Sequence, residues 1–428
     1  MRPTIRLLIA VSSIIALTAS AQAATFYVAT NGNDANPGTQ AQPWATLQHG
    51  VSTIAPGDTI LVESGTYAGC RIASSGQAGS VKTLKADTGA TVIINVPGAS
   101  NSHSSNLEIE LFNNTVSYWV IDGFEVAGSP HHGIDIRGTD FITVQNCNVH
   151  NSVNTGIFLA FSYHPLIQNN QCSSNGEHGI YQSNSGDYPT IRGNTLHHNF
   201  GAGIHMNGDV KQKPGDGIIS FAVVEKNIIY ENGTGGGSAI NCDGVSDGII
   251  RNNLIYNNHA SGISLFATDG AEGSSRNKVY NNTIVMAADG RWCVNIPKSK
   301  GSKPNPTGNK VKNNILYTPR VDKGSILTYS SSVSGFESDY NIVVDRFSAN
   351  GGNTIIALSQ WRTFGYDTHS ILSTPDQLFV NPAANDYHLK AGSPAGNSGI
   401  TLSEVPDDIE GVIRPRGTAY DIGCYESL

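Results

Sequence analysis

A unit of about two dozen residues repeats between residues 118 and 317. An apolar residue opens each unit, and successive copies lie 23, 23, 24, 33, 26, 29 and 32 residues apart. These opening residues are Ile121, Val144, Ile167, Ile191, Val224, Ile250, Val279 and Val311. A period of this length, built from segments too short for helices, predicts a solenoid in which each unit forms one coil. Each coil buries its apolar side chains by stacking on its neighbours.

A column made mostly of asparagines follows three positions after each opening residue. It reads Phe124, Cys147, Asn170, Asn194, Asn227, Asn253, Asn282 and Asn314. Asn tolerates the left-handed backbone of a sharp turn, and its side-chain amide can bond the next coil. A second signal is a recurring Gly-Ile pair inside short stretches that alternate apolar and polar residues, as strands do. The pairs begin at Gly133, Gly156, Gly179, Gly203 and Gly262. We therefore expect coils of several short strands, stacked about 4.8 Å apart.

With these columns, the chain resembles right-handed parallel β-helix proteins of the pectate-lyase-like superfold, over roughly residues 80–345. That superfold contains secreted bacterial polysaccharide lyases, epimerases and hydrolases. The resemblance implies an all-β fold, a single-stranded right-handed parallel β-helix with a short N-terminal helical cap and an irregular C-terminal cap. Because one fold hosts many chemistries, the resemblance does not by itself choose the reaction.

Residues 1–23 have the features of a secretory signal peptide. Arg2 and Arg6 supply the charged start, residues 7–17 the apolar run, and residues 21–23 a small-residue cleavage site. We expect a secreted or periplasmic protein. Removing this segment leaves 24 bases against 34 acidic residues, a formal charge of −10, which argues against nucleic-acid binding. No later stretch is long enough to span a membrane, and we expect a monomer.

Three further segments follow the signal peptide. Residues 24–118 form an N-terminal cap and the first coils, with an amphipathic helix expected between Trp44 and Ile54 to cover the open end of the stack. Residues 119–345 form the β-helix core with a substrate groove. Residues 346–428 lose the repeat and are expected to close the C-terminal end. The six cysteines fall mostly on inward columns, which indicates buried free thiols rather than disulfides.

Two columns of side chains point out of the stack after each Gly-Ile pair, because successive strand residues face opposite sides. The first reads Asp135, Phe158, Tyr181, His205, Asn241, Ser264 and Asn295. The second reads Arg137, Ala160, Ser183, Asn207, Asp243, Phe266 and Pro297. Polar groups for hydroxyls and rings for sugar faces are typical of carbohydrate sites, although an ordinary solvated sheet remains the alternative.

Two insertions lie beside this face, at residues 208–221 and 298–309, and they carry five lysines, including Lys298. Long loops on a rigid scaffold often build binding walls. Basic walls on an acidic protein favour an anionic polymer, unless the lysines only keep the loops soluble.

Cleavage of a uronate polymer by β-elimination needs a base, an acid and groups that hold the carboxylate as charge builds. We assign the catalytic parts to Tyr181, His205, His178 and Arg137. The substrate-binding set is Asp135, Phe158, Asn207, Asn241, Asp243, Phe266, Asn295 and Lys298. The expected partner is an acidic polysaccharide or oligosaccharide.

Other readings stay open. No cofactor is required by this chemistry, but Ca²⁺ could bind through Asp209 and Asp243. The same two carboxylates could serve an inverting glycoside hydrolase. A uronate C5-epimerase shares the first step of the lyase, and a noncatalytic glycan-binding protein would need only the face.

Overall fold

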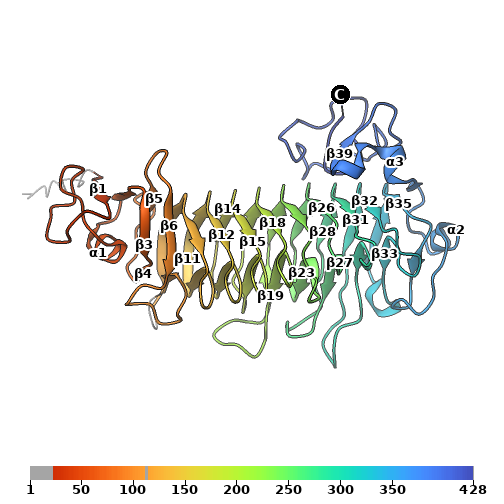
Figure 1. The fold of residues 1–428 in the computed structure, drawn as a ribbon. Helices are drawn as coiled ribbons and strands as arrows, with labels where there is room; N and C mark the ends of the chain where they lie inside the picture. The colour runs from red at the N-terminus through yellow and green to blue at the C-terminus, as the bar shows by residue number, and fades with distance from the viewer. Residues whose placement is uncertain (1–22, 111–113, 428) are drawn as a thin grey trace, which may run out of the picture.

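The computed structural model describes residues 23–110 and 114–427, so the predicted signal peptide lies outside the described residues apart from Ala23. Three long parallel sheets run the length of the molecule, with 12, 12 and 11 strands in the described part of the chain. Each complete coil contributes one strand to each sheet, in the order first, second, third (Figure 1). The predicted all-β parallel β-helix is therefore confirmed.

The first sheet contains the residues that open each repeat. Its strands are β1 (Thr25–Val28), β2 (Thr59–Val62), β5 (Lys82–Ala86), β8 (Val116–Asp122), β11 (Thr139–Gln145), β14 (Leu166–Gln168), β17 (Thr190–Arg192), β21 (Val223–Glu225), β25 (Ile249–Arg251), β28 (Lys278–Tyr280), β31 (Lys310–Lys312) and β34 (Glu337–Asp339).

The second sheet follows the asparagine turn. Its strands are β3 (Gly65–Ala68), β6 (Val92–Val96), β9 (Glu125–Ala127), β12 (Asn148–His150), β15 (Gln171–Ser173), β18 (Thr195–His197), β22 (Ile228–Tyr230), β26 (Leu254–Tyr256), β29 (Thr283–Val285), β32 (Ile315–Tyr317), β35 (Ile342–Val343) and β37 (Ile371–Leu372).

The third sheet contains the Gly-Ile pairs and the candidate functional face. Its strands are β4 (Arg71–Ile72), β7 (Leu107–Ile109), β10 (Ile134–Arg137), β13 (Ile157–Ala160), β16 (Ile180–Ser183), β19 (Ile204–Asn207), β23 (Ser238–Asp243), β27 (Ser261–Phe266), β30 (Val294–Asn295), β33 (Ile326–Leu327) and β36 (Phe347–Ser348). Two strand pairs stand apart from these sheets: β20 (Ile219–Ser220) with β24 (Val245–Ser246), and the antiparallel β38 (Phe379–Asn381) with β39 (Asp386–Leu389).

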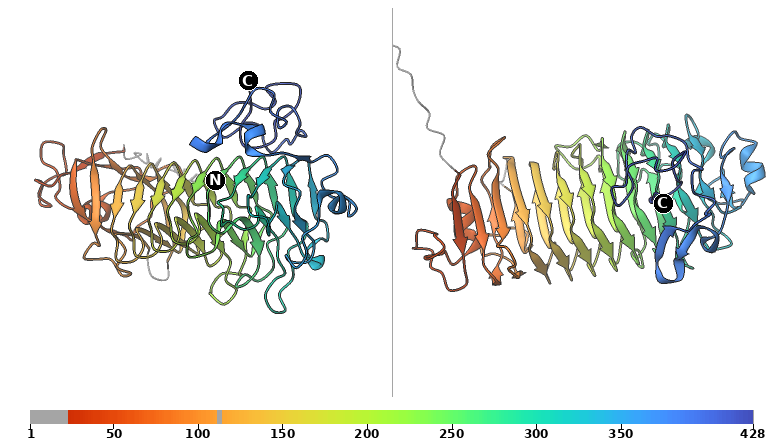
Figure 2. Two further views of the ribbon diagram at one scale, coloured as in Figure 1. Left: turned by 45° about the vertical axis from the view of Figure 1, so that its right-hand side comes forward. Right: turned by 90° about the horizontal axis from the view of Figure 1, so that it is seen from above.

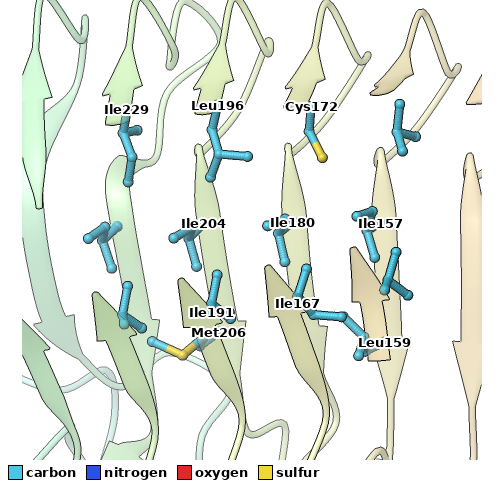
Figure 3. Packing of buried hydrophobic residues seen from close by; sticks show 14 of the residues in the cluster. Ile157, Leu159, Ile167, Cys172, Ile180, Ile191, Leu196, Ile204, Met206 and Ile229 are labelled. Carbon is cyan, nitrogen blue, oxygen red and sulfur yellow. The ribbon is translucent and has the colours of Figure 1, made fainter. Parts of the chain in front are cut away.

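Equivalent apolar residues stack coil upon coil inside the three sheets. Ile157, Ile180 and Ile204 occupy one column in the third sheet, and each is fully buried. Figure 3 shows this column beside the inward residues of the other two sheets, including Cys172, which replaces an aliphatic side chain. Each inward side chain packs against the equivalent side chains of the coils above and below it, and also against the other inward side chains of its own coil. The core is therefore continuous from end to end.

The predicted asparagine ladder is present and fully bonded. The Oδ1 atom of Asn227 accepts the backbone N–H and the side-chain amide of Asn194 at 3.0 Å each. Its own Nδ2 donates to Ile191 O at 3.0 Å and to Asn253 Oδ1 at 2.9 Å. The pattern continues through Asn314 to Asn341. The turn thus satisfies its buried polar groups entirely within the stack.

One detail of the asparagine prediction is wrong. The left-handed backbone belongs to the residue before the ladder asparagine, as at Asn252 (φ 53°) and Lys226 (φ 56°). The ladder position itself turns inward to bond the next coil. The structure also contains a second ladder, after the second sheet, made of Asn175, Asn199, Asn232 and Asn258.

The N-terminal cap is confirmed, with a shorter helix than the spacing predicts. Helix α1 (Leu47–Thr53) begins after Thr46, whose side chain accepts the N–H of His49 and so caps the helix. Leu47 and Val51 are each 1% exposed and lie over the first coils. The remaining helices are α2 (Leu358–Arg362) and α3 (Pro375–Leu378). None of the helices in residues 23–110 and 114–427 has the length and apolar character needed to cross a membrane.

The prediction that residues 346–428 cap the end of the stack holds only for the first third of that segment. Trp361 of α2 is buried and stacks on Phe347 at 5.1 Å between ring centroids, which closes the C-terminal end. From α3 onward the chain folds back and lies along the flank of the β-helix, as the views in Figures 1 and 2 agree.

The reason for this folding back is the outward face of the second sheet. Leu254 and Ile315 point outward from β26 and β32, yet they are 4% and 0% exposed because they share one apolar cluster with Leu378, Phe379 and other residues of the C-terminal segment. Lys226 is joined to Asp407 at 2.6 Å on the same flank. Apolar residues at these outward positions need cover that an end cap cannot give.

All six cysteines are free and buried, as the sequence predicts. Cys424 belongs to the flanking segment, where its backbone N–H donates to Thr283 Oγ1 at 3.0 Å. Although it is near the end of the chain, Cys424 therefore lies beside the stack, next to β29.

Removing one rung of the ladder tests how much it contributes. Asn227→Ala takes away four hydrogen bonds at a buried position, and we expect the free energy of unfolding to fall by about 2–4 kcal/mol because the partners stay buried. Urea unfolding followed by fluorescence measures this. Asn353→Ala, at an exposed cap position, is the matched control and should change stability by less than about 0.5 kcal/mol. Equal unfolding midpoints for both variants would contradict a stabilising ladder.

Candidate functional site

The predicted register of the outward column is confirmed on the third sheet. Asp135 pairs with Phe158, Phe158 with Tyr181, Tyr181 with His205, and His205 with Asn241 on successive coils. Ser264 and Asn295 extend the same column. The side chains of seven consecutive coils therefore share one face, each about 4.8 Å from the next at the backbone.

Three rings form the centre of this face. The Tyr181 and His205 rings lie 4.5 Å apart between centroids, and the His178 ring lies 4.8 Å from His205 and 5.2 Å from Tyr181. His178 precedes Gly179 at the start of β16, so it reaches the face from the edge of the sheet. The structure thus brings together the three residues that the sequence assigns to proton transfer.

Neighbouring amides fix the orientation of two of these rings. Asn207 Nδ2 donates to the Tyr181 hydroxyl at 3.3 Å, and the Asn241 amide lies 2.8 Å from His205 Nδ1. His178 Nδ1 accepts the backbone N–H of Ala202 at 2.9 Å, so a neutral His178 carries its proton on Nε2. Asn207 and Asn241 therefore orient the Tyr181 and His205 side chains, and the sugar contacts predicted for the two asparagines stay predictions.

Burial sets the protonation states of the cluster. It lowers the pKa of His178 to about 4 and holds the pKa of His205 well below its usual value, with the nearby His178 adding to the effect. Burial also raises the pKa of Tyr181. At neutral pH the two histidines are uncharged and can accept a proton, while Tyr181 keeps its proton and can donate it.

The tautomer of His205 depends on which end of the Asn241 amide faces it. If Asn241 Oδ1 accepts a hydrogen bond from Nδ1–H, then Nε2 is free to act as a base. The opposite amide orientation would make Nε2 a donor. The structure places Asn241 Nδ2 2.8 Å from His205 Nδ1, so in this orientation Nδ1 accepts and Nε2 carries the proton. A base role for Nε2 requires the flipped amide, with Oδ1 facing Nδ1.

Asp135 and Phe158 have different surroundings from those predicted. Asp135 is 1% exposed and accepts two hydrogen bonds from Arg137, at 2.8 and 3.1 Å. Phe158 is 7% exposed, with His132 stacked on its ring at 4.2 Å and the Arg137 guanidinium 4.7 Å from its centroid. This burial does not favour the sugar contacts predicted for Asp135 and Phe158.

Arg137 lies too far from the three rings to share a sugar carboxylate with them. It stands two coils before Tyr181, about 10 Å along the stack. The Phe158 ring occupies the coil between them, in edge contact with Tyr181 at 5.4 Å. Its predicted role in the same catalytic step is not supported by this geometry.

Asp243 has a structural role. Its carboxylate oxygens accept the backbone N–H groups of Thr268 at 2.8 Å, Asp269 at 2.9 Å and Gly270 at 2.9 Å, and the residue is 2% exposed. These bonds hold the loop after β27. A carboxylate saturated in this way does not fit the predicted calcium site with Asp209, the sugar contact or the hydrolase pair.

The loops lie where the insertions predict. Figure 1 shows them projecting beyond β19, β23 and β27 at one edge of the third sheet. Lys303 donates to the carbonyl of Thr268 and ties two loops together. Lys298 is exposed, Phe266 is half-buried, and Asn295 donates to Ser264 Oγ at 3.1 Å. These three residues lie two or more coils beyond His205, so they stay predicted contacts for a longer polymer.

Three histidines at the N-terminal end of the face are absent from the set predicted from the sequence. His131 and His132 adjoin Asp135, and His103 adjoins Glu108 and Glu110. His132 precedes Gly133 just as His178 precedes Gly179, so the repeat contains the signal that would have found it.

Both histidine groups could hold a metal by geometry, but their carboxylates are already committed. Asp135 is bonded to Arg137. Glu108 accepts the backbone N–H groups of Ser102 and His103. These bonds do not favour a cation at either group.

The titration of the cluster can be measured directly. In histidine-selective NMR spectra we expect His178 to lose its proton with a midpoint near pH 4 and His205 to stay neutral well below pH 6.5. His388 is the internal control: burial opposes its charge, but hydrogen bonds to Asp386 and Glu410 raise its pKa. Titration of His178 and His205 at or above the His388 midpoint would contradict the buried, neutral cluster.

Comparison with known proteins supports this architecture. The model of the Pel9A-like right-handed β-helix region matches residues 26–288. Pectate lyase L of Paenibacillus polymyxa (strain SC2) is 29% identical over 172 residues, which cover 38% of this chain and only 37% of that protein. The crystal structure of pectate lyase Pel9A matches 95% of this chain and 97% of its own, with a TM-score of 0.64 and 17% identity. A rhamnogalacturonan lyase matches 69% of this chain and 83% of its own, with a TM-score of 0.53 and 18% identity. The chain therefore belongs to the family of proteins with a Pel9A-like right-handed β-helix region.

Proposed function

We propose that this protein is a polysaccharide lyase that cleaves a uronate-containing polymer by β-elimination. The observation that carries the proposal is the contact of a neutral His205 with a protonated Tyr181 on one outward face. The similarity to a pectate lyase and to lyases of the same fold supports it. The polymer would lie along the third sheet, parallel to the stack.

In this mechanism the Asn241 amide is flipped, so that Oδ1 accepts a hydrogen bond from Nδ1–H of His205 and leaves Nε2 free. Nε2 of His205 then removes the proton on the carbon next to the uronate carboxylate. The electron pair left behind forms the new carbon–carbon double bond as the bond to the 4-oxygen breaks. Tyr181 gives its proton to that departing oxygen, and the two side chains return to their starting states by exchanging protons with water. His178, 4.8 Å from His205, helps to keep His205 uncharged because two cations would repel each other.

Negative charge on the carboxylate must be stabilised as the proton leaves. The amides of Asn207 and Asn241 are the donors next to the reacting pair, and the lysines of the loop after β19 lie at the edge of the face. We propose that these groups serve in place of calcium, since Asp243 does not fit a calcium site. We also propose export directed by residues 1–23, and action as a monomer.

The observations favour the lyase over the hydrolase. An inverting hydrolase would need the Asp243 carboxylate to be free for acid–base catalysis. In the structure this carboxylate accepts hydrogen bonds from three backbone N–H groups. A uronate epimerase would use the same first step and then return a proton to the opposite ring face. It differs by leaving the polymer uncut.

Substitution of the two reacting residues tests the proposal. His205→Ala and Tyr181→Phe should each reduce turnover of a polyuronate by at least about 100-fold, because each removes one proton-transfer group. The assay follows the ultraviolet absorbance of the new unsaturated sugar over a panel of polyuronates, with and without a chelator. We expect the chelator to leave the rate unchanged.

The matched controls are His369→Ala and Tyr340→Phe, a stacked pair just beyond β34 at the C-terminal end of the β-helix, and both should keep full activity. New reducing ends without the absorbance would indicate a hydrolase instead. Altered uronate composition in an uncut polymer would indicate an epimerase. Full activity in both site variants would show that the site is misplaced.

The pH dependence carries a second test. Because His205 must be neutral to act as the base, and its pKa lies well below the usual value, kcat/KM should stay constant from neutral pH downward and fall only well below pH 6.5. Asn241→Asp places a carboxylate beside Nδ1 and favours the charged ring. The acid limb should then move toward alkaline pH by about one pH unit or more. An unchanged limb in this variant would exclude His205 as the titrating base.

A further inference from the structure

An exposed aromatic ring lies at the edge of the third sheet where His178 enters the face. Phe200 is 58% exposed, more than any other phenylalanine, tyrosine or tryptophan in the part of the chain that the structure describes. Its neighbour Gly201 approaches His178 so closely that a Cβ there would lie 2.6 Å from the imidazole Nδ1. Phe200 precedes β19, whereas the insertion after β19 begins at the other end of the strand. The ring therefore lies beside the proton-transfer cluster, at the edge opposite the insertion loops.

This ring lies flat against a glycine of the next coil. A Cβ at Gly235 would lie 2.2 Å from Phe200 Cε1 and 2.5 Å from both adjacent ring carbons, so the glycine is beneath the face of the ring and not at its rim. The Gly235 N–H donates to the Phe200 carbonyl at 2.8 Å, and the Phe200 N–H donates to Asn175 O at 3.0 Å. Three coils thus hold the ring with one face on the backbone and the other open to solvent. An open aromatic face suits the apolar face of a sugar.

A cleft of about 570 Å³ adjoins this ring, because Thr234, one residue before Gly235, is part of its wall. The other lining residues are His198, Glu231, Asn257, His259, Ala287 and Ala288. They supply amide, imidazole and carboxylate groups that can bind sugar hydroxyls. No lysine or arginine is among the described residues that line the cleft, so it offers no permanent positive charge to a uronate. The carboxylate of Glu231 also disfavours an anion, and the cleft therefore suits a neutral sugar.

The position of this edge decides which part of a substrate can reach it. The polymer in the proposed mechanism lies along the third sheet, parallel to the stack, with its backbone sugars at Tyr181 and His205. Phe200 and the cleft lie to one side of that path, beyond His178, at the turn between the second and third sheets. A sugar that contacts them therefore branches from the backbone instead of continuing it.

We infer that Phe200 and the adjacent cleft bind a neutral sugar that branches from the uronate backbone, so that the enzyme prefers branched polymers. This inference rests on the proposed lyase activity. The open ring face stacks on the branch sugar, and Glu231 and Asn257 bind its hydroxyls. These contacts are remote from the bond that breaks and are the same in the ground state and the transition state. They therefore lower KM and leave kcat unchanged.

The test compares a uronate polymer that carries neutral sugar branches with the same polymer after enzymatic debranching. Wild-type protein should show a KM about 10-fold lower on the branched form, as expected for one good stacking contact. Phe200→Ala should abolish that difference by raising only the KM on the branched form. Gly235→Ala should do the same, because the new methyl group displaces the ring without removing it.

A control variant and a binding measurement complete the design. Phe364→Ala removes a phenylalanine that is 49% exposed just after α2, and it should match wild type on both polymers. Calorimetry on the His205→Ala protein measures affinity for the two polymers without turnover. Adding Phe200→Ala to that protein should weaken binding of the branched form alone.

Equal affinity of the His205→Ala protein for the branched and debranched polymers would overturn the inference, even if the lyase assay succeeds. A Phe200→Ala effect of the same size on both polymers would also overturn it, because the ring would then contact the backbone. Absence of unsaturated product from wild-type protein, with branch-dependent binding still measured by calorimetry, would overturn the proposed function instead.

Discussion

Parallel pairing between coils is the constraint on which the rest of this molecule depends. Every strand of a coil must match the strand below it, because a shift of one residue would turn its buried side chains outward. The asparagine ladders strengthen this match, since each amide bonds both the backbone and the amide of the adjacent coil. Extra residues are therefore accommodated only at the turns. The 33-residue unit between Ile191 and Val224 contains its surplus in the loop after β19.

The fixed register also explains the chemistry of the outward face. Tyr181 and His205 are neighbours because their strands pair, and their backbones cannot separate without breaking the stack. The partial burial of the cluster then lowers the pKa of His205 and raises the pKa of Tyr181. It disfavours a charged imidazole and a charged phenolate alike, so one environment yields a proton acceptor and a proton donor at neutral pH.

Much of this site could be predicted from columns in the sequence. The alternation after each Gly-Ile pair places Tyr181, His205 and Asn241 on one face, and the structure agrees. The same columns mislead at Asp135 and Asp243. An outward position does not reveal that Arg137 or a loop backbone will take up the carboxylate, because those contacts depend on side-chain reach and loop path. His132 was not among the predicted site residues, although the repeat aligns it with His178.

The sequence by itself determined the coil, its period, its inward columns and the face that holds the candidate site. These features follow from periodic local preferences and from burial of apolar residues, both of which can be read along the chain. Three features were decided only by the tertiary structure. The residues after α3 cover the outward face of the second sheet, the Arg137 guanidinium lies over the Phe158 ring, and the Asp243 carboxylate binds the backbone of a loop. Each of these features depends on contacts between residues that the local sequence pattern does not specify. Many such contacts are compatible with the same amino-acid sequence pattern, and only the packing of the folded chain selects one of them.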